Sequence, residues 1–167
     1  MNPRLILPVA PPAAGKSYTA KTLVSKELLY PEDVVEPDYY RWLLTGDRAN
    51  QDVNKTVFQI VNSIVFNRLH YGNTVYLDAT NINSSHRTGL LDKVKNSPNE
   101  VKLIVLVSRL DRDILDERNL NRPYPVPQKV LKRMWDQSQK LQVQTLTANY
   151  GAKVYTLEEA QEWESIP

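Results

Sequence analysis

The chain contains no cysteine, and this absence excludes disulfide bonds and thiolate-bound metal sites from its 167 residues. Histidine occurs only twice, and no metal-ligand spacing surrounds either position. No apolar run approaches the ~20 residues of a membrane-spanning helix, and the N-terminus lacks the pattern of a secretory signal. We therefore expect a cytoplasmic protein with no membrane partner.

A strong excess of one charge is also lacking. The 21 lysines and arginines stand against 19 aspartates and glutamates, which gives a net charge of +2. A charge this small does not by itself indicate a nucleic-acid partner, so any affinity for a polyanion has to come from local clusters of basic residues. The length of 167 residues predicts one domain, which we place at 1–167.

Short apolar segments rich in β-branched residues or tyrosine recur along the chain and predict strands at 4–9, 33–36, 73–77, 101–107 and 153–156. Helical patterns alternate with them, at 16–29, 52–70, 84–96, 111–120, 127–148 and 157–164. This alternation predicts an α/β fold with a central parallel sheet of about five strands and helices on both faces. No apolar stripe is left over to indicate a homo-oligomer. Ligands of such sheets bind beyond the carboxyl ends of the strands.

A phosphate-binding loop is predicted between the first strand and the first helix. The segment 10–17 reads Ala-Pro-Pro-Ala-Ala-Gly-Lys-Ser and has the Gly-Lys-Ser ending of a P-loop. In such a loop Gly15 lets the backbone approach a phosphate, Lys16 reaches the β- and γ-phosphates, and the Ser17 hydroxyl ligates Mg²⁺. The helix that follows adds unpaired N–H groups and a positive dipole end. We therefore expect ATP or another nucleoside triphosphate, with Mg²⁺, bound by Ala13, Ala14, Gly15, Lys16, Ser17 and Tyr18.

This P-loop retains a single glycine. The full pattern has another glycine five residues before Gly15, where this chain has Ala10. If that position required a left-handed backbone, alanine would cost about 1–2 kcal/mol. Ala10 and Ala13 are nevertheless small enough to let a phosphate approach.

Asp38 and Arg41 follow the predicted strand 33–36 and form the second candidate group. A carboxylate at this sheet edge can accept a proton from an acceptor hydroxyl or hold Mg²⁺ through water. Arg41 lies one helical turn later on the same face, where it can bind a phosphate of the acceptor. The same pair also fits an N-cap aspartate with an i,i+3 ion pair, and the pattern leaves both interpretations open. The neighbouring aromatic residues suit either base stacking or core packing: Tyr39, Tyr40 and Trp42.

A third group ends the predicted strand 73–77 and consists of Asp78, Thr80 and Asn81, with Arg87 following. Asp78 suits a water-mediated contact to Mg²⁺ or a contact to the acceptor, and Thr80 and Asn81 can fix the neighbouring loop by hydrogen bonds. We assign all four residues to acceptor binding. A capping turn would use the same residue types.

Arg118 and Arg122 lie four residues apart at the end of the predicted helix 111–120, before a turn interrupted by prolines. This is the composition of a lid, which we place at 111–127. Lid arginines stabilise charge on a transferring phosphoryl group, and a comparable arginine contributes about 10³-fold or more to the rate. We therefore assign both arginines to the donor phosphates, although a solvated arginine pair would have the same local pattern.

Taken together, these motifs resemble the kinase domain of phage-type 5′-hydroxyl polynucleotide kinases, which are P-loop kinases, over about residues 4–140. The resemblance implies that ATP donates its γ-phosphoryl group to a 5′-hydroxyl end of DNA or RNA, in nucleic-acid repair. It implies Asp38 as the general base and Arg41 as the clamp on the acceptor phosphate. Lys16 and Arg122 would act on the donor phosphates, with Arg118 in support. The matching residues are Pro12, Gly15, Lys16, Ser17, Asp38, Arg41, Asp78, Thr80, Asn81, Arg87, Arg118, Asn119, Arg122, Val126 and Pro127.

Ala10, Ala13 and Tyr39 depart from the pattern of that family, and no Asp-x-Asp phosphatase motif is present. Two other functions stay open. One is a P-loop kinase for a nucleoside, a modified base or another small hydroxyl compound. The other is a nucleotide-binding ATPase that is not a kinase. A GTPase does not fit, because Asn54-Lys55 is not followed by the aspartate of an Asn-Lys-x-Asp motif.

Overall fold

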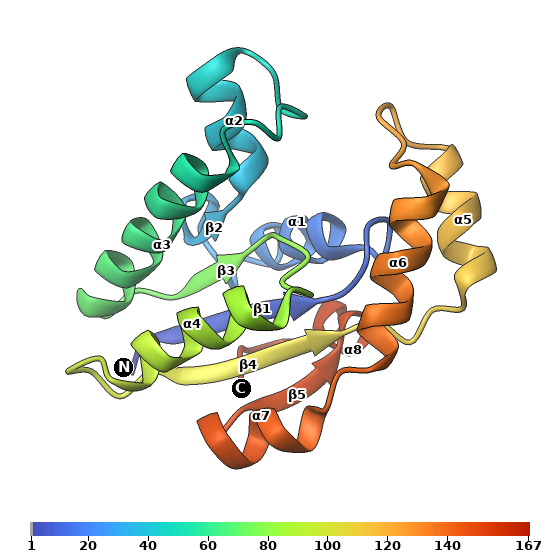
Figure 1. Cartoon of the computed structure of the whole chain (residues 1–167). Coiled ribbons are helices and arrows are strands. Elements are labelled where there is room, and N and C mark those ends of the chain that lie inside the picture. Colours follow the sequence, from blue (N-terminus) through green and yellow to red (C-terminus); the bar gives the residue numbers. More distant parts are fainter. Residues whose placement is uncertain (1) are drawn as a thin grey trace.

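Five strands form one parallel sheet in the order β2-β3-β1-β4-β5 in the computed structural model, which describes residues 2–167 (Figure 1). Every neighbouring pair runs parallel, and Leu5 of the central strand lies opposite Val75 on one side and Leu103 on the other. The α/β class and the five-stranded parallel sheet are confirmed. The strands are β1 (Arg4–Val9), β2 (Val34–Val35), β3 (Val75–Leu77), β4 (Lys102–Val107) and β5 (Lys153–Thr156).

Helices cover both faces of this sheet (Figure 1). Successive residues of a strand point to opposite faces, so Leu5, Leu7 and Val9 of β1 pack into one core cluster with α3, α4 and α7, whereas Ile6 packs into a second cluster with α1, α5 and α8. Burial on both faces explains the nearly continuous apolar runs of β1 and β4. The helices are α1 (Lys16–Ser25), α2 (Pro37–Thr45), α3 (Asn54–His70), α4 (Ser84–Lys95), α5 (Arg112–Leu120), α6 (Gln128–Gln139), α7 (Val143–Tyr150) and α8 (Leu157–Gln161), with a 3₁₀ turn at Pro31–Asp33.

The single helix predicted over 127–148 was wrong, because the chain forms α6 and α7 with a break between them. Gln142 has ψ 88° and is not helical. The break lets α6 pack against α5 while α7 packs against β5. No glycine or proline marks it in the sequence, so the apolar periodicity continues across the turn.

Smaller differences concern helix ends and one further helix. The predicted ranges did not include α2, which begins with Pro37, a residue well suited to the first helical position. Gly46, with φ 75°, caps its C-terminal end. α1 ends at Ser25 and not near 29, since Glu27 takes a left-handed φ of 57°. Across residues 2–167, no helix combines the length and apolar character that crossing a membrane requires.

Candidate active site

The phosphate-binding loop leaves β1 and enters α1 with two left-handed residues. Gly15, the N-cap of α1, has φ 101°, and Ala13 has φ 66°. Ala10 is fully buried, and its amide donates to the Thr80 carbonyl oxygen at 3.1 Å. Ala10 is not among the residues with positive φ. The left-handed backbone conformation that the sequence suggested for Ala10 therefore occurs at Ala13 instead.

Lys16 lies buried at the start of α1, and its Nζ donates to the Pro11 carbonyl oxygen at 2.7 Å. Burial lowers the pKa of Lys16 from 10.5 to about 8. Asp78 and Asp38 act in the opposite direction, while Arg122 lowers the pKa of Lys16 further. Groups from the P-loop, the end of β3, the start of α2 and the lid thus act on one ammonium group.

Asp78 follows β3 directly, and its amide donates to the Val35 carbonyl oxygen of β2 at 2.9 Å. Burial raises the pKa of the Asp78 carboxyl, while a hydrogen bond with the Ser17 side chain and the charge of Lys16 lower it. Tyr76 of β3, two residues before Asp78, is fully buried, and its hydroxyl donates to the Lys16 carbonyl oxygen at 2.8 Å. The end of β3 and the start of α1 are thereby held together.

The pairing of Ser17 with Asp78 fits a magnesium site. Mg²⁺ is bound in proteins by one or two oxygen side chains, with phosphate oxygens and waters completing the octahedron. Across residues 2–167, no group of three or more His, Cys, Asp or Glu side chains could hold a metal by itself. Ser17 would hold the ion together with a triphosphate, and Asp38 and Asp78 line the same two cavities.

Asp38 is the second residue of α2, and the N-cap of that helix is Glu36. The N-cap interpretation of Asp38 is therefore wrong, but the i,i+3 ion pair does form, because Arg41 donates through Nη1 to Asp38. Arg41 is only 6% exposed, and the Oδ1 atom of Asn54 accepts hydrogen bonds from its Nε at 2.9 Å and its Nη2 at 2.7 Å. The ring of Phe58 lies beside the guanidinium group, with its centroid 6.0 Å from the guanidinium carbon.

Asn54 was missed as a site residue by the sequence analysis. It is the first residue of α3 and is separated from Arg41 by 13 positions. Their contact depends on the packing of α2 against α3, so no local sequence pattern indicates it.

The lid is held in shape by Asn119, which is 1% exposed. Its Nδ2 donates to the Val126 carbonyl oxygen at 2.8 Å, and its Oδ1 accepts from the Val126 amide at 2.9 Å. This paired contact closes the turn that carries Arg122. Arg118 and Arg122 both line the cavity of the P-loop.

Asn81 and Arg87, two of the residues assigned to acceptor binding, are not brought into this cavity. Asn81 has φ 50°, and its Nδ2 donates to the carbonyl oxygens of Pro8 at 2.8 Å and Ala79 at 3.0 Å. Arg87 donates through Nη1 to the carbonyl oxygens of Asn81 and Ile82 and lines a separate cavity between α4 and α7. Both side chains fix the loop after β3, whereas Thr80 does line the P-loop cavity.

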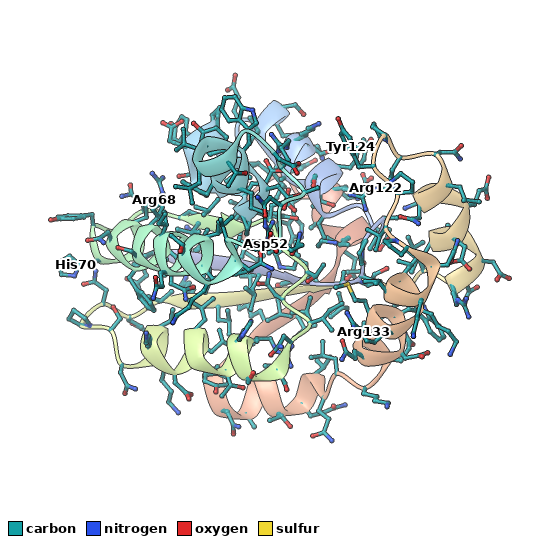
Figure 2. The ribbon with its side chains drawn as sticks, turned by 45° about the horizontal axis from the view of Figure 1, so that its top comes forward. Asp52, Arg68, His70, Arg122, Tyr124 and Arg133 are labelled. Carbon is teal, nitrogen blue, oxygen red and sulfur yellow. The ribbon has the colours of Figure 1, made fainter. Side chains whose placement is uncertain are left out.

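Two cavities meet between the P-loop, α2 and the lid. One of about 770 Å³ is lined by 12–13 and 15–18 of the P-loop segment, with Arg41 and both lid arginines. The other, of about 1250 Å³, runs along α1 and α2 to the lid tip, where Figure 2 shows Arg122 and Tyr124. The residues common to both cavities are Ser17, Glu36, Asp38, Gln51, Asp78, Arg122 and Val126.

Solved structures share this fold along nearly the whole chain. The tunicamycin resistance protein of Deinococcus radiodurans has a TM-score of 0.60 at 17% identity, covering 98% of this chain and 99% of that one. Kti12 of Chaetomium thermophilum, solved in complex with ADP-AlF3, has a TM-score of 0.59 at 14% identity, covering 98% and 99%. A gluconokinase of Sinorhizobium meliloti 1021 has a TM-score of 0.56 at 16% identity, covering 96% and 88%.

No curated protein matches the chain in sequence. One family model does match: AAA_33, described as an AAA domain, covers residues 5–141 and with them the P-loop, α2, the end of β3 and the lid. The sheet and the helices on its two faces are those of the P-loop kinases among the solved structures. The chain therefore belongs to the AAA_33 family of AAA domains and has a P-loop kinase fold.

Proposed function

We propose that the protein is a kinase that transfers the γ-phosphoryl group of ATP to the 5′-hydroxyl end of a nucleic acid. The observation that carries this proposal is the meeting of Ser17, Asp38, Asp78 and Arg122 at the wall common to two cavities. The smaller cavity contains the P-loop and Arg41, and the larger one leaves room for an acceptor to approach the shared wall. Phosphoryl transfer depends mainly on such positioning and on electrostatic stabilisation.

On the donor side, Lys16 and the lid arginines neutralise the phosphates. Lys16 is protonated at neutral pH with a pKa of about 8 and carries its charge to the β- and γ-phosphates. Arg118 and Arg122 approach the same cavity from the lid. Ser17 would hold Mg²⁺, which would supply positive charge to offset that of the donor phosphates.

On the acceptor side, Asp38 is the general base. Its carboxylate takes the proton of the acceptor hydroxyl while that oxygen forms the new bond to the γ-phosphorus and the bond between this phosphorus and ADP breaks. Arg41 has five N–H groups, of which three donate to Asp38 and Asn54. The remaining two N–H groups are suited to a phosphate on the acceptor, which supports a nucleotide end over a simple alcohol.

A nucleoside or another small hydroxyl compound is the second candidate acceptor. The charge of the larger cavity favours such an uncharged acceptor, because carboxylates along the cavity wall offset the cations that would attract phosphates. A nucleotide-binding ATPase that is not a kinase would need the same donor side but would not need Asp38 as a base.

A transfer assay with labelled ATP separates these functions. We expect label on a 5′-hydroxyl oligonucleotide, less on free nucleosides and none on small alcohols. Asp38→Asn should abolish transfer while the Kd for ATP changes less than threefold. Asp52→Asn is the matched control, since Asp52 is exposed close by but lines neither cavity (Figure 2). Full transfer by Asp38→Asn, or ATP hydrolysis that no acceptor changes, would overturn the proposal.

A further inference from the structure

Two exposed aromatic side chains line the larger cavity. Trp42 of α2 is 49% exposed, and Tyr124 at the lid tip is 78% exposed. Neither ring is part of the two core clusters, although Tyr40 of the same helix does pack against one of them. Of the two interpretations that the sequence left open for these aromatics, core packing thus applies to Tyr40 and leaves Trp42 available for a ligand.

The two rings come from different walls of the cavity. Residues of α2 line one side of the cavity, and the lid tip, where Figure 2 shows Tyr124 next to Arg122, lines another. The same cavity extends to Asp38 and Asp78. A flat group bound between the rings would therefore belong to a molecule whose hydroxyl reaches the proposed general base.

The charge of this cavity argues against a long phosphate track. Arg48 is paired with Glu36, with Nη2 and Oε1 2.5 Å apart. Successive phosphates of a bound strand need cations along their path. Among the described residues that line the cavity, carboxylates and cations nearly balance: Glu36, Asp38, Asp47 and Asp78 against Lys21, Arg48 and Arg122.

The size of the cavity argues against a very small acceptor. Its volume of about 1250 Å³ exceeds the roughly 300–1,000 Å³ of ordinary small-molecule pockets. Aromatic rings bind bases by stacking, and this stacking tolerates different sequences because every base has a π-face. A nucleobase thus satisfies the aromatic walls, the balanced charge and the available space.

We propose that Trp42 and Tyr124 form an aromatic clamp that holds the terminal nucleobase of a single-stranded acceptor. This inference rests on the proposed function, because it assumes that the acceptor enters the cavity beside Asp38. Recognition is then confined to the end of the strand: stacking supplies the affinity, and few phosphates are contacted. Lengthening the acceptor from two to ten nucleotides should change its KM less than threefold.

The test compares two dinucleotide acceptors with a 5′-hydroxyl group. One carries 2-aminopurine as its 5′ base, and the other is abasic at that position. We expect Trp42→Leu and Tyr124→Leu to raise the KM for the base-bearing acceptor about tenfold, with kcat changed less than twofold and the KM for the abasic acceptor unchanged. Tyr71→Leu is the matched control, because Tyr71 is 77% exposed and lines neither cavity.

Binding gives a second measurement that does not need catalysis. Stacking quenches 2-aminopurine fluorescence, so the wild-type protein with ADP and Mg²⁺ should quench the probe, and both Leu variants should lose this quenching. Quenching without transfer would leave the clamp standing and overturn the proposed function. If the Leu variants transfer phosphate as well as the wild type, or if their KM rises equally for both acceptors, the clamp is overturned and the proposed function stands.

Discussion

Asn54 holds Arg41 by two hydrogen bonds to a single oxygen atom, from Nε at 2.9 Å and from Nη2 at 2.7 Å. Arg41 in turn donates to Asp38, so Asn54 orients the proposed base from the start of another helix. The guanidinium group is buried, and its orientation therefore depends on these partners more than on solvent.

Asn54→Ala should weaken binding of the acceptor while ATP binding is kept. Losing hydrogen bonds to a buried charge costs about 1.5–3 kcal/mol, which corresponds to a rise of roughly tenfold or more in the KM for a phosphate-bearing acceptor. The KM for an acceptor without a phosphate should rise much less. Steady-state kinetics with both acceptors measures the difference, and equal effects on the two would contradict a positioning role. Asn50→Ala is a control, since the Asn50 side chain accepts a local hydrogen bond from the Asp52 amide.

ATP binding should weaken above pH 8. Burial lowers the pKa of Lys16 to about 8, so its ammonium group loses its proton above that pH and no longer attracts the phosphates. The Kd for ATP, measured by calorimetry between pH 7 and 10, should rise with pH. Lys16→Arg keeps its charge over this range, so binding by that variant should be nearly independent of pH.

The Lys16 ammonium group also makes the free energy of unfolding depend on pH. The pKa of Lys16 is about 8 in the folded state and 10.5 as the ordinary value. Between these two pH values the unfolded chain binds more protons, so this group makes the free energy of unfolding rise with pH. Lys16→Met should remove this rise, and chemical denaturation at pH 7.5 and pH 10 measures it. An unchanged slope in the variant would contradict burial of the ammonium group.

Asn119→Ala should open the lid turn. The variant leaves the amide and carbonyl of Val126 without their partner, at a cost of about 1–3 kcal/mol in the free energy of unfolding. Because Arg122 follows in the same turn, kcat should fall as well. Asn121→Ala is the matched control, since its side chain is exposed and donates to the Glu117 carbonyl oxygen of its own helix at 3.1 Å. Equal effects of the two substitutions would show that Asn119 does not shape the lid.

Ala13→Gly and Ala10→Gly should act in opposite directions. Glycine at Ala13 relieves a left-handed backbone that costs about 1–2 kcal/mol and loses about 0.5–1 kcal/mol to unfolded-state entropy, so the free energy of unfolding should rise slightly. Ala10 has no positive φ and is fully buried. Glycine at this position removes a buried methyl group and raises the conformational entropy of the unfolded chain. The free energy of unfolding should therefore fall by about 1–2 kcal/mol. Thermal unfolding of both variants is the measurement.

Elements with local sequence signals could be predicted without the structure. The apolar runs at 4–9 and 101–107 predicted β1 and β4 because residues buried on both faces are apolar throughout. The Gly-Lys-Ser ending marked the P-loop because that backbone needs a glycine where α1 begins, and Gly15 does take φ 101°. The parallel sheet followed from the alternation of strands and helices.

Which side chains meet in the site could not be predicted in the same way, because it depends on how the helices pack. The contact between Asn54 and Arg41 depends on how α2 packs on α3, and the placement of Arg87 away from the P-loop cavity depends on its bonds to the loop after β3. The break before α7 arises because α6 packs against α5 and α7 packs against β5. A periodic apolar pattern indicates that residues are buried, but it does not indicate which element covers them. Local propensity acts between neighbours in the chain, whereas the geometry of a site is set by contacts between segments that the fold brings together.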